Sequence, residues 1–195
     1  MTDYCTLAEF KAFAKIVSLD ATDDTVISML ITSASAWIEK FTGRSFTSTS
    51  ATKYYDVPTS GKDRRIIYID DCLSLTTVTN GDSTVITSAN YQLLPLNTSP
   101  KYAIRLKDSS AYDWEPTSTG DTLGAISLAG SWGYSATTPG DIKAACLEIA
   151  LAAYRRRSTI GSQQMAGVTP AGVIVQPEDV SKQVMYVLRG YMRAF

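Results

Sequence analysis

Residues 22–44 read TDDTVISMLITSASAWIEKFTGR, a stretch in which apolar side chains recur at helical spacing. Asp23 and Asp24 lie at its start, where the positive end of a helix dipole favours carboxylates. Gly43 suits the position just after a helix end. We therefore predict one long helix. Its expected buried stripe is Val26, Leu30, Ala34, Trp37 and Phe41, flanked by Ile27, Ile31 and Ile38.

Helical patterns also occupy the rest of both chain ends. Thr6-Leu7-Ala8-Glu9 fits a capping box, in which the hydroxyl and the carboxylate accept hydrogen bonds from free backbone N–H groups. A later helix opens at Thr138-Pro139, because threonine caps well and proline fits the first helical position. This helix is expected to end at Arg155-Arg156-Arg157. Its predicted buried stripe is Ile142, Ala145, Cys146, Ile149, Ala150, Ala153 and Tyr154.

A last helix is predicted to begin at Pro177-Glu178-Asp179 and to carry a single apolar stripe. A helix of this length is not stable alone in water, so the stripe must pack against its own domain or against a neighbouring subunit. We expect this region to be mobile in the free subunit and to become ordered on a partner. The stripe consists of Val180, Val184, Val187, Leu188 and Tyr191.

Residues 45–138 contain short runs of β-branched and aromatic side chains separated by turn residues. Such runs predict short antiparallel strands, and Asn80-Gly81 is a strong hairpin signal. Residues 107–120 are expected to form a surface loop. The predicted strands include 65–69, 73–79, 84–87, 91–94, 102–106 and 123–128, the last of them before Gly130-Ser131-Trp132-Gly133.

The sequence therefore predicts the α+β class, within one connected domain of 195 residues. A helical bundle core is expected from residues 1–44 and 139–195, and an antiparallel β domain is inserted at 45–138. Trp37, Phe41, Ile142 and Ile149 are expected in the helical core.

Composition narrows the possible functions. The net charge is −1, from 18 basic and 19 acidic side chains, which disfavours a protein held to nucleic acid by bulk charge. Histidine is absent, which removes the commonest neutral-pH general base and the commonest metal ligand. The three cysteines are widely spaced, as expected for buried thiols in a reducing compartment. No apolar run approaches the length of a membrane span and no signal peptide is visible, so we expect no membrane association.

Few residues suggest chemistry. Asp70 and Asp71 are adjacent carboxylates, but neighbouring strand residues point to opposite faces and cannot easily share a proton or a metal ion. Cys146 lies on an apolar helix face, where a packed thiol is expected rather than a nucleophile. We predict no catalytic residues, no cofactor and no metal site.

Two features remain open. Arg155, Arg156 and Arg157 form either a solvated helix end that complements the helix dipole or a basic surface facing DNA or an acidic protein. Residues 158–176 carry no charged side chain and have the apolar run Val173-Ile174-Val175 near their end. That segment is either an arm that orders on a partner or a flexible linker.

The order of these signals resembles the head–tail connector, or adaptor, proteins of long-tailed bacteriophages. The resemblance covers about residues 4–157. No single motif decides it, but the succession is specific. The motifs are Tyr4-Cys5-Thr6-Leu7-Ala8-Glu9-Phe10, Thr42-Gly43-Arg44-Ser45-Phe46, Tyr54-Tyr55-Asp56, Asn90-Tyr91-Gln92-Leu93, Gly130-Ser131-Trp132-Gly133 and Thr138-Pro139 followed by Ile142-Lys143-Ala144-Ala145-Cys146.

The resemblance implies a structural virion protein at the head–tail junction, which is located in the host cytoplasm during assembly. It implies a ring, usually of twelve copies, beneath the portal protein. Such a ring extends the channel for genomic DNA, which passes without sequence-specific contacts, and presents a surface to the next connector or tail-completion protein. No catalysis is expected.

The C-terminal region commonly engages the portal in this family, and this suggests an interface here with the portal or a neighbouring copy. Two alternatives stay open: another virion component, such as a tail-completion or neck protein, and a small hydrolase or transferase without histidine. The expected interface residues are Val173, Ile174, Val175, Val180, Val184, Val187, Leu188 and Tyr191, with Arg155, Arg156 and Arg157 facing the DNA channel or a partner.

Overall fold

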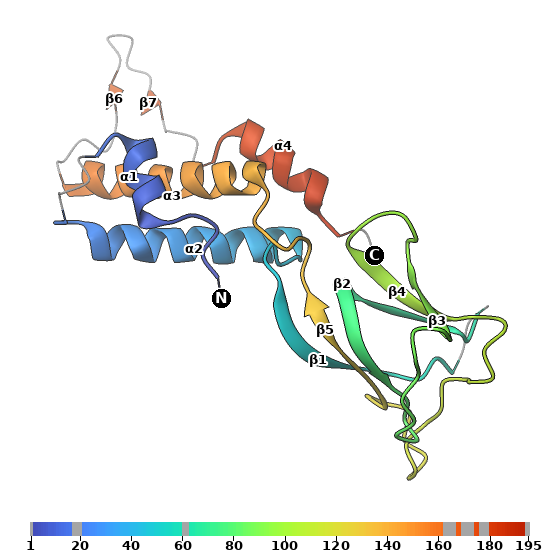
Figure 1. Ribbon diagram of the computed structural model, residues 1–195. Helices are drawn as coiled ribbons and strands as arrows, with labels where there is room; N and C mark the ends of the chain where they lie inside the picture. Colours follow the sequence, from blue (N-terminus) through green and yellow to red (C-terminus); the bar gives the residue numbers. More distant parts are fainter. Residues whose placement is uncertain are drawn as a thin grey trace. The chain divides into compact units, whose positions relative to one another are not determined.

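The computed structural model describes residues 2–16, 21–59, 63–161, 167–168, 174–175 and 180–193 (Figure 1). The chain mixes helices with an antiparallel sheet, which confirms the α+β class; the bundle arrangement of the helices stays a prediction. The helices are α1 (Leu7–Ala14), α2 (Asp24–Thr42), α3 (Gly140–Gly161) and α4 (Lys182–Tyr191). The strands are β1 (Thr49–Tyr55), β2 (Ile66–Thr79), β3 (Tyr91–Leu94), β4 (Lys101–Leu106), β5 (Ile126–Trp132), β6 (Gly167–Val168) and β7 (Ile174–Val175).

The chain divides into two compact units. The helical unit comprises Met1–Arg44 with Thr138–Phe195, and the β unit comprises Ser45–Thr137. In the helical unit α2 lies along α3, and α1 and α4 both contact this pair (Figure 1).

The capping box predicted for the first helix is confirmed. Thr6 Oγ1 accepts a hydrogen bond from the Glu9 N–H at 3.2 Å, and Glu9 Oε2 accepts one from the Thr6 N–H at 2.8 Å. The second Glu9 oxygen accepts from Lys143 Nζ at 2.7 Å, which ties α1 to α3. The predicted end of the second helix is also confirmed, because Gly43 follows α2 with a left-handed φ of 68°.

The predicted buried face of α2 is wrong, because the helix is rotated by about one residue from the predicted orientation. The three isoleucines expected at the flank, Ile27, Ile31 and Ile38, are fully buried, whereas Trp37 and Phe41 are partly exposed. These two rings stack on each other with centroids 5.2 Å apart. Two apolar stripes adjoin in this helix, and periodicity alone does not say which one faces α3.

The later helices also differ from their predicted bounds. α3 begins at Gly140, one residue after the proline predicted as its first helical residue, and continues four residues past Arg157 to Gly161. α4 begins at Lys182 rather than at Pro177, because Ser181 is the residue that caps it and accepts a hydrogen bond from the Val184 N–H at 3.2 Å. Pro177, Glu178 and Asp179 lie outside the described residues. In α3, Ile142 is buried as predicted, whereas Ile149 is partly exposed.

The β unit is a five-stranded antiparallel sheet in the order β1-β5-β2-β4-β3. Two segments predicted as separate strands, 65–69 and 73–79, form the single strand β2. The first part of β2 pairs with β4 and the second with β5, and the register shifts around Cys72 where the partner changes. Gly130-Ser131-Trp132 lies inside β5 rather than after it. The core of the unit includes Ile67, Ile69, Cys72, Ile104, Leu106, Ile126, Leu128 and Trp132.

The Asn80-Gly81 turn reverses the chain, but the predicted strand 84–87 pairs only through the single bridge between Thr79 and Val85. The Asn80 side chain is instead used by the loop that follows β4. Its Nδ2 donates to the Asp113 carbonyl at 2.9 Å, and its Oδ1 accepts from the Glu115 N–H at 3.0 Å. This loop, predicted at 107–120, is therefore anchored on the turn.

Candidate functional site

The stripe predicted for the last helix is used largely within the chain. Val184 and Leu188 are buried, and α4 contacts both α2 and α3. The other stripe members, Val180, Val187 and Tyr191, are partly exposed. Of the two partners left open by the sequence, the chain's own helical unit is the one that α4 contacts here. The interface role predicted for this stripe stays a prediction.

Polar contacts reinforce the attachment of α4 to α3. Tyr191 Oη donates to Asp141 Oδ2 at 2.7 Å, near the start of α3. Ser181 Oγ donates to Glu148 Oε2 at 3.1 Å, two turns further along. These two contacts lie at opposite ends of α4, so they fix its direction along α3. α4 therefore packs on the chain's own helices, and the expected ordering of this region on a partner stays a prediction.

Among the described residues, the opposite side of α4 is exposed. Tyr186 is 80% exposed, and it lines a shallow surface hollow with Val180, Lys182, Met185 and Arg189. Residues Lys182–Tyr191 contain two basic side chains and no acidic one. The exposed face of α4 is therefore an aromatic and basic surface, which we call the α4 face.

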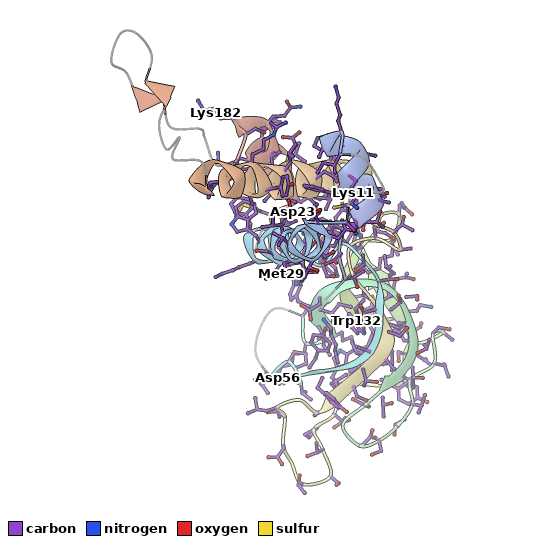
Figure 2. The ribbon with its side chains drawn as sticks, turned by 90° about the vertical axis from the view of Figure 1, so that its left-hand side faces the viewer. Lys11, Asp23, Met29, Asp56, Trp132 and Lys182 are labelled. Carbon is purple, nitrogen blue, oxygen red and sulfur yellow. The ribbon has the colours of Figure 1, made fainter. Side chains whose placement is uncertain are left out.

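A second surface, which the sequence reasoning missed, lies on α2. Met29 is 67% exposed and lies on the side of α2 away from α3, whereas Lys182 lies on the opposite side of the helical unit (Figure 2). The hydroxyls of Ser28 and Thr32 donate to carbonyls one turn earlier, at 2.9 and 3.1 Å, so their polar atoms are partly satisfied inside the helix. This uncharged α2 face is formed by Thr25, Ser28, Met29, Thr32, Ser33 and Ala36.

The arginine triplet is not at a helix end. α3 continues to Gly161, so its last turn holds no basic residue and the proposed complement to the helix dipole is weak at this position. Arg155 and Arg156 are exposed, and each has an electrostatic or hydrogen-bonding partner in the chain. The side chain of Arg157 lies outside the described residues.

The segment expected to be an arm is described only in part. Ile174 and Val175 form β7, which pairs antiparallel with β6. Their side chains, and Val173 as a whole, lie outside the described residues. The interface role of these three residues stays a prediction.

The adjacent carboxylates of β2 have structural partners. Lys53 Nζ donates to Asp70 Oδ2 at 2.7 Å, and Tyr55 Oη donates to the same oxygen at 3.3 Å. Asp71 is buried. Within the described ranges, histidine, cysteine, aspartate and glutamate form no group of three or more that could hold a metal ion. The helices of that same part of the chain are each too short or too polar to cross a membrane.

Comparisons with known proteins are informative at the level of the fold. No protein-family model and no curated protein matches this sequence. A solved structure of the neck of an empty gene transfer agent (GTA) particle, computed with C6 symmetry, matches with a TM-score of 0.60 and 16% identity over 98% of this chain and 91% of that chain. The chain has the fold of a particle neck protein.

A second match gives the same result. The neck of the native GTA particle, computed with C12 symmetry, aligns with a TM-score of 0.56 and 16% identity. It covers 100% of this chain and 95% of that chain. The likeness therefore includes the helical unit and the β unit together.

Proposed function

We propose that this chain is a head–tail connector subunit that forms a ring beneath the portal, extends the DNA channel and joins the head to the tail. The observation that carries the proposal is the shared fold with neck chains over nearly the full length of both proteins. The connector-like order of the sequence motifs supports the same role independently. The protein acts by assembly rather than by catalysis.

A ring of identical subunits needs two different surfaces on each copy, because every contact is head-to-tail. The α2 face and the α4 face meet this requirement, since Met29 and Lys182 lie on opposite sides of one helical unit (Figure 2). The α2 face is uncharged and the α4 face presents Tyr186, a residue type enriched at the energetic centres of interfaces. We assign these two faces to contacts with neighbouring copies.

The C-terminal region is proposed to meet the portal through residues that are not buried inside the subunit. Val187 and Tyr191, which lie outside the hollow of the α4 face, retain exposed area, and Val173-Ile174-Val175 precedes them in the chain. Val184 and Leu188 support this surface from beneath, because they attach α4 to α2 and α3.

The arginine triplet is proposed to contact DNA phosphates without reading base sequence. The charge-neutral triple variant Arg155→Gln, Arg156→Gln, Arg157→Gln should fold normally, while DNA retention by assembled particles should fall and lose part of its salt dependence. Unchanged DNA retention at every salt concentration would contradict the proposal that the arginines contact DNA.

Co-sedimentation of the purified chain with purified portal tests the proposed position. The wild-type chain should sediment with the portal, and Tyr186→Ala together with Met29→Ala should reduce the number of copies bound per portal. Tyr68→Ala is the matched control, since Tyr68 is 74% exposed on the β unit. Binding to a tail component but not to the portal would favour a tail-completion role instead.

A further inference from the structure

Two of the three cysteines meet inside the helical unit. Cys5, just before α1, and Cys146, on α3, are 141 residues apart in sequence, yet their Sγ atoms are 3.6 Å apart. Both are buried, with 4% and 0% of their surface exposed. Ser35 of α2 completes the cluster, with its Oγ 3.5 Å from the Cys146 Sγ. Segments from three parts of the chain therefore converge on one pair of thiols.

The two sulfur atoms have different roles in this contact. The Cys5 S–H donates to the Cys146 Sγ, which lowers the pKa of Cys146 and raises the pKa of Cys5. The hydroxyl of Ser35 also favours the ionised form of Cys146. The contact therefore favours ionisation of Cys146 over that of Cys5, and Cys5 is the thiol next to it.

We propose that Cys5 and Cys146 are a latent disulfide, which closes when the folded subunit meets hydrogen peroxide or a similarly small peroxide. A disulfide needs sulfur atoms about 2.0 Å apart, so the two must approach by roughly 1.6 Å. Cys5 lies in the segment before α1 rather than inside a helix, so the two sulfur atoms can approach without unwinding α1. A small oxidant is required because both thiols are buried.

The reaction has two steps that balance. The Cys146 thiolate attacks one peroxide oxygen, the O–O bond breaks, and hydroxide leaves to give a sulfenic acid on Cys146. The Cys5 sulfur then attacks the Cys146 sulfur, the S–O bond breaks, and water leaves as the disulfide forms. Overall, two thiols are oxidised by two electrons and one peroxide is reduced to two waters.

The bond would fasten the start of the chain to α3. It would close a loop that contains α1, α2 and the whole β unit, and long loops restrict the unfolded chain strongly. A subunit made in a reducing cell would carry the thiols free, and a particle released into an oxidising medium would gain the cross-link. Cys72, in the β unit, has no part in this pair and serves as an internal reference.

Mass spectrometry of the folded wild-type chain tests this directly. After brief peroxide treatment, unfolding and alkylation, one cysteine should be alkylated instead of three, and that one should be Cys72. Trypsin should release residues 1–11 joined to residues 144–155, with a mass two hydrogens below the sum. The midpoint of thermal unfolding should rise by roughly 5–15 °C and return on reduction.

Variants separate the bond from general oxidation. Cys72→Ser should still form the cross-link, whereas Cys5→Ser and Cys5→Ala should not form it and should accumulate sulfenic or sulfinic acid on Cys146. Three alkylated cysteines in wild type, sulfinic acid on Cys146 in wild type, or a cross-link with no thermal shift would each overturn the proposal.

Discussion

Leu188→Ala is expected to destabilise the isolated subunit strongly, because Leu188 attaches α4 to the chain's own helices. The side chain is 0% exposed, and the substitution removes three carbon atoms. Their transfer from water contributes about 2.4 kcal/mol at about 0.8 kcal/mol per carbon. A residual cavity adds to this, since buried leucine-to-alanine changes cost about 2–5 kcal/mol. We therefore expect a loss of about 3 kcal/mol in the free energy of unfolding.

Tyr186→Ala is the matched control on the same helix. Tyr186 is 80% exposed, so its removal should change the free energy of unfolding by less than about 0.5 kcal/mol. Tyr186→Ala, which should hardly change stability, should instead reduce binding to neighbouring copies during assembly. Urea unfolding of the free chain, followed by circular dichroism at a helix-sensitive wavelength, measures both changes in stability.

The result that refutes this reasoning is a loss below about 1 kcal/mol for Leu188→Ala in the free subunit. It would mean that α4 is not part of the folded core before assembly and that its stripe is ordered by a partner. Hydrogen exchange gives an independent reading, because amides of residues 184–191 should be protected in the isolated chain.

Three further outcomes follow from the packing. Ile38→Ala should cost about 2–5 kcal/mol in urea unfolding, and more than Trp37→Ala, since only Ile38 is fully buried; the reverse order would restore the predicted face of α2. Gly81→Ala should raise proteolysis of the loop after β4, because a Cβ there would lie 2.2 Å from the Glu115 carbonyl oxygen, and wild-type resistance would contradict that contact. The Lys143 ammonium and the Thr6 N–H lower the pKa of Glu9 in the folded chain. The stability contributed by the ionised Glu9 carboxylate should therefore be complete above the ordinary glutamate pKa of 4.5 and lost as pH falls through the lower pKa of the folded chain. Glu9→Gln should remove this pH dependence of the free energy of unfolding, measured by unfolding at a series of pH values.

Local signals in the sequence were sufficient where the structure itself is local. The Thr6–Glu9 capping box and the Gly43 helix end need only neighbouring residues, and both are present. The bent strand β2 is different, because its partner changes from β4 to β5 at Cys72 and no local pattern encodes that exchange. Asn80 likewise gives a turn signal, but its contacts with residues 113 and 115 depend on a loop more than 30 residues away.

The candidate surfaces show the same contrast between features set by local sequence and features set by long-range packing. The apolar stripe of α4 was visible in the sequence, but the sequence left open whether its partner was the same chain or another. The burial of Leu188 and the packing of α4 on α2 and α3 become visible only in three dimensions. The α2 face was missed because Met29 belongs to neither apolar stripe of the helix, and most of its neighbours on that face are small or polar. The thiol pair was equally hidden by a separation of 141 residues.

Solution mass measurement combined with negative-stain imaging, with and without purified portal, tests the central claim most directly. A connector subunit should appear on the portal as a closed ring with rotational symmetry, and the mass of the complex should increase by a whole number of subunits equal to the order of that symmetry. A chain that remains monomeric and leaves the mass and the image of the portal unchanged would contradict the account.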